Sequence, residues 1–353
     1  MKVAIVSLKF SPGHIAHLKA YQELFLNITD NVSLYVAPEY KKFLKNTRDI
    51  VYTNDVSDIV NSNSDLVFIY NISTKNIKLV NECKKRKIRT VYVLHEPKAS
   101  FKDLLAEGHA IPKTIGAYIV NSKICRKVSK VLLASETGKL NYEKYMKKLN
   151  NNYDVFPLIF TDQFDNNITL KRIYFSFIGG FSDVHGCNEF IEFLKYAISN
   201  RKNIKFLIAS KNNLDRVLED ELLKKAINLG QLKVQHGRPM TTEEINNFYR
   251  QSICVWNAYN RSTQSGVLPN SLMQGAPLIV NSNGAAKEVI KNNDVGVFIN
   301  MPPNNEEVFN AYTYINDHIQ YMEEAARNKF LKCYCYTNFI DLAKKVIFEE
   351  KVK

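Results

Sequence analysis

The sequence predicts an α/β protein with two doubly wound domains of similar size. Short apolar runs alternate with stretches of helical apolar spacing, and this alternation is typical of parallel sheets flanked by helices. A strand, a glycine-containing turn and a helix open the chain at residues 2–26, and the same order starts again at residues 172–198. A length of 353 residues is enough for two hydrophobic cores. We therefore expect a first domain at residues 1–163, a second at 164–327 and a closing helical segment at 328–353.

The first domain is expected to begin with a buried strand at residues 2–7 and a helix at 15–26, joined by a turn that contains Gly13. Further apolar runs of strand length, most of them separated by helical stretches, lie at residues 32–37, 49–52, 66–70, 89–94, 115–122, 131–136 and 153–160. The polar residues 161–167 follow, and we interpret them as the linker between the domains.

The second domain is expected to repeat this plan. Its first strand and glycine turn occupy residues 172–180 and lead to a helix at 188–198. Later apolar runs predict strands at residues 205–210, 254–259 and 278–280. A long helical pattern lies within residues 328–350 and ends the chain.

The composition is that of a globular protein, with 45% hydrophobic and 24% charged residues. The apolar run at the N-terminus is too short for a signal peptide, and no run of eighteen apolar residues occurs. We therefore expect a cytoplasmic protein. Its six cysteines show no paired metal-ligand spacing, so we interpret them as reduced packing residues.

The net charge of +13 favours anionic partners such as nucleic acid, anionic lipid or phosphorylated substrates. Basic residues cluster at 84–87 and 147–148, where the alternative is an ordinary solvated surface. No zinc finger, recognition helix or aromatic-interleaved single-strand motif accompanies them, so no nucleic-acid partner is expected. Contact with an anionic membrane surface suits clusters of this kind.

His95 and Glu96 directly follow the predicted strand at residues 89–94 and are the candidate catalytic residues. Open α/β sheets place their ligands at the carboxyl ends of strands, which is where this titratable pair lies. The alternative is that His95 is only satisfied by a loop carbonyl. Gly13 and His14, in the turn after the first strand, are expected at the same edge, whereas His17 fits a cap or a packing residue of its helix.

Residues 261–280 form the stretch around which the second domain is predicted to be organised. A polar, glycine-containing loop precedes a short helix from about Pro269, a Gly-x-Pro stop and a buried strand. Backbone N–H groups at such a helix start, beside the hydroxyls of Thr263 and Ser265, make a cradle for phosphate. The alternative is an ordinary loop and helix of an α/β domain.

The run Thr263 to Val267, with its continuation over residues 281–288, resembles the donor-binding signature of family 4-like glycosyltransferases, in the branch with a Thr-Gln-Ser-Gly loop. This resemblance implies the GT-B fold, in which two Rossmann-like domains face a central cleft and the terminal helix crosses back to the first domain. It also implies transfer of a sugar from a nucleotide diphosphate, of UDP or GDP type, to a growing surface glycan or lipid-linked acceptor. The family is mostly retaining and metal-independent, and no Asp-x-Asp motif suggests a metal here.

The resemblance also assigns donor-binding roles by position. Residues 232–238 resemble the family's strand and glycine under the nucleobase. Where the family commonly has an arginine and a lysine on the diphosphate, this chain has Gly180 and His185, so Lys211 and Arg261 are expected to supply positive charge. Where the family commonly has two glutamates, this chain has Ser262 and Asn270, and Asn270 can bond ribose hydroxyls. The expected donor-binding residues are Gly13, Gly179, Gly180, His185, Lys211, His236, Arg261, Thr263, Gln264, Ser265, Gly266 and Asn270.

These departures leave other functions open. A non-catalytic GT-B partner subunit of an active glycosyltransferase is the main alternative, because the usual cations and glutamates are missing. A nucleotide-sugar epimerase would need an acid pair in the cleft, for which only Glu96 is an obvious candidate. The high content of Asn, Lys and Ile indicates a bacterial source. The resemblance and the basic surface together predict a cytoplasmic protein that contacts the anionic inner face of the plasma membrane.

Overall fold

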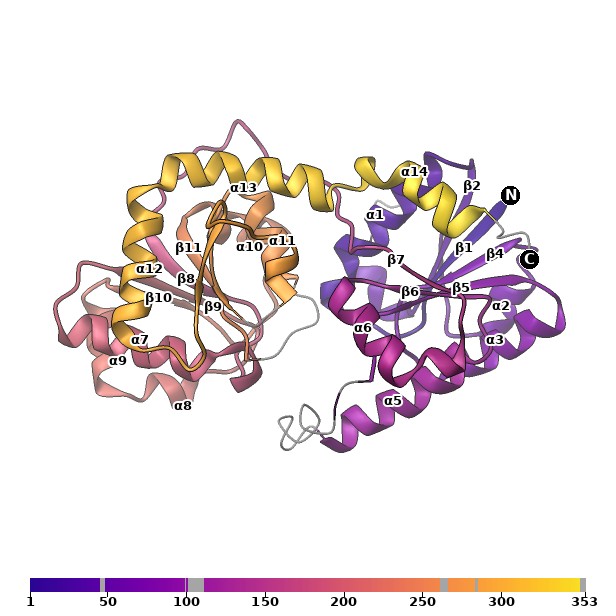
Figure 1. The fold of residues 1–353 in the computed structure, drawn as a ribbon, viewed down its shortest axis with the longest axis horizontal. Helices are drawn as coiled ribbons and strands as arrows, with labels where there is room; N and C mark the ends of the chain where they lie inside the picture. The colour runs from indigo at the N-terminus through magenta and orange to yellow at the C-terminus, as the bar shows by residue number, and fades with distance from the viewer. Residues whose placement is uncertain (45–47, 99, 101–110, 261–265, 283–284, 350–353) are drawn as a thin grey trace. The chain divides into compact units, whose positions relative to one another are not determined.

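The computed structural model in Figure 1 describes residues 1–353 except 45–47, 99, 101–110, 261–265, 283–284 and 350–353. The chain forms two compact units. Unit 1 combines Met1–Thr161 with Tyr334–Lys353, and unit 2 is Asp162–Cys333. Within the described ranges, no helix has the length and apolar character needed to cross a bilayer.

Unit 1 contains a 7-stranded parallel sheet in the order β3-β2-β1-β4-β5-β6-β7. The chain builds outward from β1 to β3 and then returns to the other side of β1 with β4, so the strand order reverses between β1 and β4. The strands are β1 Lys2–Ser7, β2 Asn31–Val36, β3 Ile50–Tyr52, β4 Leu66–Ile69, β5 Arg89–Leu94, β6 Lys130–Leu133 and β7 Tyr153–Val155. The main helices are α1 Ile15–Leu26, α2 Val56–Val60, α3 Lys75–Lys85, α5 Ile111–Cys125 and α6 Glu136–Tyr145.

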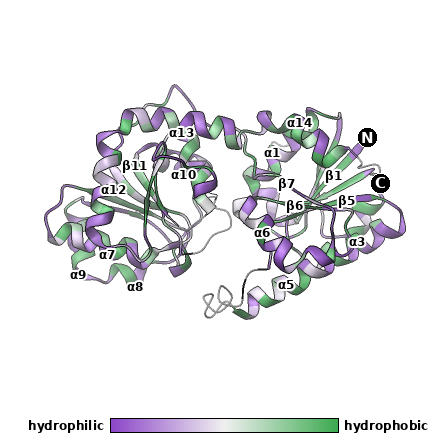
Figure 2. Ribbon diagram, in the orientation of Figure 1, coloured by the Kyte–Doolittle hydropathy of each residue, from purple (hydrophilic) through white to green (hydrophobic). Residues whose placement is uncertain are grey.

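Both faces of this sheet are buried, which explains why its strands are apolar at nearly every position. On β1, Val3 and Ile5 join one hydrophobic cluster with residues of α1, while Ala4 and Val6 join a second cluster with residues of α3. The helices cover these faces with one apolar side each, and the hydropathy colouring of Figure 2 shows both hydrophilic and hydrophobic stretches along helices such as α3. The sheet therefore holds its strand ends on a rigid, doubly covered core.

The strand predicted at residues 115–122 is wrong, because this segment lies within helix α5. Its β-branched residues and Tyr118 favour a strand by propensity. The buried residues Tyr118, Asn121, Ile124 and Cys125 nevertheless recur at spacings of three and four, so one side of a helix packs on the unit. Packing has decided the structure against local propensity.

Unit 2 contains a 6-stranded parallel sheet in the order β10-β9-β8-β11-β12-β13, and its strand order reverses between β8 and β11. The strands are β8 Tyr174–Ile178, β9 Lys205–Ala209, β10 Leu232–Gln235, β11 Ser252–Asn257, β12 Leu278–Asn281 and β13 Gly296–Ile299. The helices are α7 Cys187–Ser199, α8 Asp215–Leu218, α9 Glu221–Asn228, α10 Thr242–Arg250, α11 Val267–Met273, α12 Asn305–Asp317 and α13 Ile319–Tyr334.

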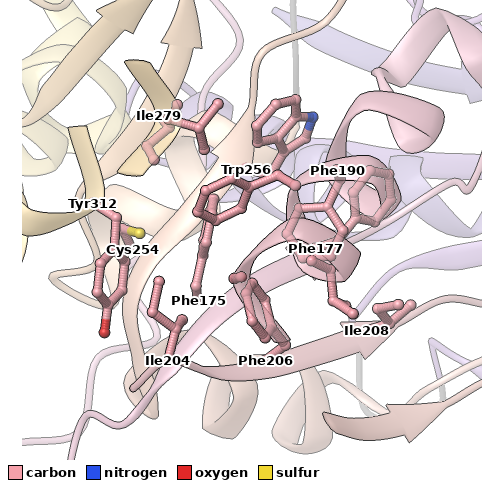
Figure 3. Close-up of a cluster of buried hydrophobic side chains, with 14 of the residues drawn as sticks. Phe175, Phe177, Phe190, Ile204, Phe206, Ile208, Cys254, Trp256, Ile279 and Tyr312 are labelled. Atoms are coloured by element: carbon pink, nitrogen blue, oxygen red, sulfur yellow. The ribbon is translucent and has the colours of Figure 1, made fainter. Parts of the chain in front are cut away.

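The core of unit 2 is rich in aromatic side chains. Phe175 on β8, Phe206 on β9 and Trp256 on β11 pack together with Phe190 of α7, as the close-up in Figure 3 shows. Trp256 is the single tryptophan of the chain and is 1% exposed. Its fluorescence therefore reports on the folding of unit 2.

The long helical pattern at residues 328–350 is broken in the structure. Helix α13 ends at Tyr334, and a 3-10 helix at Tyr336–Phe339 and helix α14 at Ile340–Ala343 follow. The break is explained by Phe160, which forms hydrogen bonds with the backbone of this turn. Its N–H donates to Tyr334 O at 2.9 Å, and its carbonyl accepts from Tyr336 N at 3.0 Å.

The segment around Val346 and Phe348 packs on the sheet of unit 1. Lys130 on β6 donates to Val346 O at 2.6 Å and pairs with Asp154 at the same distance, and Arg89 on β5 donates to Phe348 O at 2.8 Å. The carbonyls at this end of the chain are thus satisfied by cations of the sheet.

The linker predicted at residues 161–167 is held on unit 2. Arg327 of α13 binds Asp162 at 2.7 Å, and its guanidinium lies 4.3 Å from the ring centre of Phe164. Arg250 approaches the same ring at 5.2 Å. These contacts order a segment whose composition is that of a loop.

Candidate functional site

Each unit gathers polar side chains where its strand order reverses. In unit 1 this place lies between β1 and β4, and in unit 2 between β8 and β11. Open α/β sheets bind ligands outside the carboxyl ends of strands at such a reversal. The residues that directly follow these strands therefore form the candidate site of each unit.

In unit 1, three histidines and a tyrosine meet at this edge. His14 comes after β1, Tyr70 after β4 and His95 after β5, while His17 lies on α1. The ring of Tyr70 stands edge-on to both His14 and His95, with centroids 5.1 and 4.7 Å apart. Side chains from three segments that are distant in the sequence thus form one cluster.

Backbone carbonyls fix the proton position on two of these imidazoles. Nε2 of His95 lies 2.7 Å from Tyr70 O, and Nδ1 of His17 lies 3.0 Å from Ile159 O. Because a carbonyl oxygen can only accept, each of these nitrogens carries the proton. The loop carbonyl that a purely structural interpretation of His95 requires is therefore present.

The cluster holds its histidines in the neutral form. Burial, followed by the positive charge that a protonated His95 would carry, lowers the pKa of His14 from 6.5 to about 2 and that of His17 to about 3. Burial also lowers the pKa of His95 to about 4. A neutral imidazole offers one donor and one acceptor, which suits a hydroxyl group better than an anion.

Two polar atoms in this cluster are unsatisfied. Nδ1 of His14 and the hydroxyl of Tyr70 are buried, and neither has a hydrogen-bond partner among the described residues. Buried polar atoms are normally paired, so a water molecule or a ligand hydroxyl is the expected partner.

The other residues of unit 1 that were singled out in the sequence differ in how exposed they are. Glu96 is exposed directly after His95, and Gly13 is exposed beside His14. A Cβ at Gly13 would meet no atom of the described residues within 4 Å, so their packing does not require glycine there. His17 is 4% exposed and packs on Phe160, with ring centroids 4.3 Å apart, so the packing alternative holds for this residue.

In unit 2, the loop after β8 begins with Gly179, and the backbone conformation there explains why this residue is glycine. Gly179 has φ of +132° and donates from its N–H to Ala209 O at 2.9 Å. A Cβ there would lie 3.3 Å from Cγ2 of Val267, the first residue of α11. This loop and the start of α11 are thus in close contact.

His185 and Gly180 lie together in the same loop. Nδ1 of His185 is 2.6 Å from Gly180 O, and the ring packs on Tyr259, which follows β11, with centroids 4.5 Å apart. The structure therefore brings the predicted residues Gly179, Gly180 and His185 to the place where the strand order reverses.

Lys211 and His236 follow the neighbouring strands β9 and β10. Lys211 is exposed. Nδ1 of His236 accepts from Leu214 N at 3.3 Å, and Nε2 lies 3.9 Å from the Asp215 carboxylate, so this histidine also connects its neighbouring loops.

Of residues 261–280, the structure describes the part from Gly266 onward. Helix α11 starts at Val267 instead of about Pro269, and the amide nitrogen of Asn270 donates to Gly266 O at 2.8 Å. This bond leaves the amide oxygen of Asn270 for other partners. The predicted residues Arg261, Thr263, Gln264 and Ser265, as well as Ser262, lie outside the described residues.

The sequence interpretation missed two residues of these clusters, Tyr70 and Tyr259. An aromatic residue at the end of an apolar run looks like core, and Tyr70 is indeed 0% exposed. Only their positions in the chain could have identified them, because each tyrosine follows a strand that lies where the strand order reverses. Across the described ranges, no three His, Cys, Asp or Glu side chains are grouped so that they could hold a metal ion.

No protein-family model matches this chain, and no curated protein sequence matches it. Solved structures do. The Anabaena protein HepE in complex with UDP-glucose has a TM-score of 0.73 at 14% identity, over 99% of each chain. A glycosyltransferase from Rickettsia africae has a TM-score of 0.70 at 12% identity, over 99% of this chain and 98% of that one.

WaaG, a glycosyltransferase involved in lipopolysaccharide biosynthesis, has a TM-score of 0.67 at 12% identity, over 99% of this chain and 100% of that chain. Such identities establish architecture and not activity. Each of these matches spans 99% of this chain and therefore includes both parallel sheets, so the expected fold class is confirmed. This chain has the GT-B fold, with two Rossmann-like domains.

Proposed function

We propose that this protein is a glycosyltransferase that moves a sugar from a nucleotide-diphosphate donor, of UDP or GDP type, to a growing surface glycan or lipid-linked acceptor. The observation that carries the proposal is the loop of Gly179, Gly180 and His185, packed against the start of α11 where the strand order of unit 2 reverses. The same fold occurs in HepE, whose structure was solved with UDP-glucose, and in WaaG.

In this proposal, the second domain binds the donor. His185 and Lys211 act on the diphosphate together with Arg261, and the Thr263 to Gly266 loop cradles it. Asn270 bonds the ribose through its amide oxygen, and His236 lies beside the nucleobase pocket. Side-chain and backbone donors aimed at the leaving diphosphate stabilise the charge that grows on it in the transition state.

The first domain binds the acceptor, with Gly13 in the turn that approaches the ligand. His95 and Glu96 are the proposed catalytic residues. Neutral imidazoles at the unit 1 edge can form hydrogen bonds with a sugar hydroxyl. Glu96 is exposed, so the same sugar can reach its carboxylate. We further propose transfer with retention and without a bound metal, as the family resemblance implies.

We also propose that the terminal segment at 328–353 crosses back to the first domain and that the protein works in the cytoplasm, at the inner face of the plasma membrane. The net charge of +13 supports attraction to an anionic lipid surface.

A non-catalytic partner subunit is the second candidate. It is favoured by one observation: the diphosphate loop carries Gly180 and His185 where family members commonly carry fixed cations. A protein of this kind would keep the fold and would have lost donor binding.

Thermal unfolding of the full chain with UDP, GDP, ADP, CMP or TDP, each with and without magnesium, tests the proposal. A ligand that binds only the native state must raise the melting temperature by mass action. A shift with one nucleotide that does not need magnesium supports the donor site and names the donor class. No shift with any nucleotide would favour the partner subunit instead.

A further inference from the structure

His185 has one ring nitrogen committed to the protein. Nδ1 lies 2.6 Å from Gly180 O and 3.2 Å from the hydroxyl oxygen of Ser182. Since the carbonyl oxygen can only accept, the proton of a neutral His185 is on Nδ1, and Nε2 then carries a lone pair. The fold thus selects one tautomer of this side chain.

The surroundings hold the ring in this orientation. A Cβ at position 180 would lie 3.1 Å from Cε1 of His185, so glycine leaves room for the imidazole edge. Tyr259 packs on the ring, and Trp256 Nε1 donates to the backbone carbonyl of His185 at 3.2 Å. Nε2 has no hydrogen-bond partner among the described residues, and it is not one of the buried atoms that lack a partner. Nε2 is therefore the nitrogen that a ligand can reach.

This arrangement decides what His185 can do for a diphosphate. The oxygens of a nucleotide-sugar diphosphate are ionised and only accept hydrogen bonds. The lone pair on Nε2 of a neutral His185 would face them as a second acceptor. Only the imidazolium, which donates from both nitrogens, can keep the bond to Gly180 and bind phosphate with Nε2.

We propose that donor binding takes up one proton on Nε2 of His185, so that this chain binds its nucleotide-diphosphate sugar through a titratable cation. The inference rests on the proposed function and goes beyond it, because it gives the donor site a pH dependence. A lysine would hold the diphosphate at any physiological pH, whereas imidazole changes its charge within that range.

Other ionisable groups around the ring set the background for this effect. Asp183 is on the same turn and Glu189 on α7; each carboxylate accepts a bond from a neutral asparagine, Asn188 and Asn260 respectively. Burial and the charge of Asp183 raise the pKa of Cys187 to about 12, so this thiol stays neutral. Tyr259 belongs to the loop after β11 and packs on the ring. Lys211 is exposed in the loop after β9. Asn212 of that same loop accepts a hydrogen bond from Phe181 N at 3.0 Å.

UDP-glucose is the appropriate probe, because its diphosphate is a diester whose charge is constant over the pH range of imidazole titration. Its dissociation constant is measured by calorimetry at several pH values between about 5.5 and about 8. At one pH the titration is repeated in two buffers of different ionisation enthalpy, which gives the number of protons taken up.

We expect the affinity for UDP-glucose to fall with rising pH, by up to about tenfold per pH unit when one proton is taken up on binding. His185→Lys should bind UDP-glucose with little pH dependence, and His185→Gln should bind weakly at every pH. His318→Gln is the matched control, since His318 is exposed at the junction of α12 and α13 and should keep the wild-type pH profile.

The outcomes separate this inference from the proposed function. Binding of UDP-glucose with the same affinity from acidic to basic pH, and no proton uptake, would overturn the role of His185 alone. A pH profile that survives in His185→Lys would do the same. Absence of binding even at acidic pH would overturn both the inference and the proposed UDP-type donor site.

Discussion

The imidazole rings of His14 and His95 stack with centroids 5.3 Å apart and planes inclined by 11°. They come from the turns after β1 and β5, on either side of Tyr70, which follows β4. Two stacked, largely buried imidazoles cannot easily both be charged, because burial penalises the cation and each charge repels the other. The edge of unit 1 is therefore built for neutral histidines.

This cluster should make unit 1 sensitive to acid. The native pKa values of about 2 for His14, about 3 for His17 and about 4 for His95 all lie below the unfolded value of 6.5. Between about pH 6.5 and about pH 4 the unfolded chain binds protons that the native state does not, so the free energy of unfolding falls as the pH falls. Fully buried His17 alone contributes up to about 1.4 kcal/mol per pH unit in that range.

Hydrogen exchange of the β1 and α1 amides at several pH values measures this slope for unit 1. His17→Phe keeps an aromatic ring beside Phe160 and removes the titration, so its slope should be shallower by about one proton. His318→Gln, at an exposed histidine in unit 2, should leave the slope unchanged. A His17→Phe slope equal to that of the wild type would mean that His17 is not held neutral.

Gly186 should tolerate alanine much less well than Gly230. The two glycines have nearly the same φ, +70° and +67°. A Cβ at Gly186 would lie 2.6 Å from Ala258 O, whereas a Cβ at Gly230 would meet no atom within 4 Å in the part of the chain that the structure describes. Gly230→Ala should cost about 1 kcal/mol from backbone strain, and Gly186→Ala roughly 1–3 kcal/mol more from the clash.

Urea unfolding followed by the fluorescence of Trp256 measures both costs. Gly186→Ala should also weaken nucleotide binding, because the same turn carries His185. Equal midpoints for the two variants would show that Ala258 can move aside and that only φ matters.

Arg172 is expected to stabilise unit 2 mainly through carbonyl groups. Its guanidinium donates to Ser252 O at 2.9 Å, Gln274 O at 2.7 Å and Tyr249 O at 3.2 Å, and it pairs with Glu323 at 2.8 Å. The arginine side chain is 10% exposed and the glutamate 44%. Arg172→Met should therefore cost about 3 kcal/mol, and Glu323→Gln less than about 1 kcal/mol.

The same Trp256 transition serves as the measurement for this pair. If Glu323→Gln were as destabilising as Arg172→Met, the ion pair and not the carbonyl bonds would be the main contribution.

The sequence predicted the parallel strands well, because strands buried on both faces are apolar at nearly every position and end at polar or glycine residues. The first strand was expected at residues 2–7 and is β1, and the run at 205–210 contains β9. Helix α5 could not be predicted in this way, since its β-branched residues favour a strand and only its tertiary contacts decide otherwise. The break after α13 likewise depends on Phe160, a residue distant in the sequence.

For the candidate site, chain order pointed to His95, because the turn after a parallel strand lies at a known edge of the sheet. The family resemblance pointed to the loop of Gly179 and Gly180. Chain order could not show which turns are neighbours. The contact of His95 with His14, and that of His185 with Tyr259, depend on the strand order β1-β4-β5 and on the adjacency of β8 and β11. Those orders are properties of the packed sheets.

Replacing His95 should separate a catalytic role from a structural one. If the neutral ring bonds the acceptor or the donor sugar in the transition state, His95→Ala should slow the release of UDP from UDP-glucose by roughly 10- to 100-fold, while the dissociation constant of UDP-glucose changes little. His17→Gln is the matched comparison, since His17 belongs to the same cluster but is fully buried and bonds Ile159 O. An equal loss of rate in both variants would mean that His95 only supports the cluster through its bond to Tyr70 O. A loss confined to His95→Ala would place its imidazole on the reacting sugar.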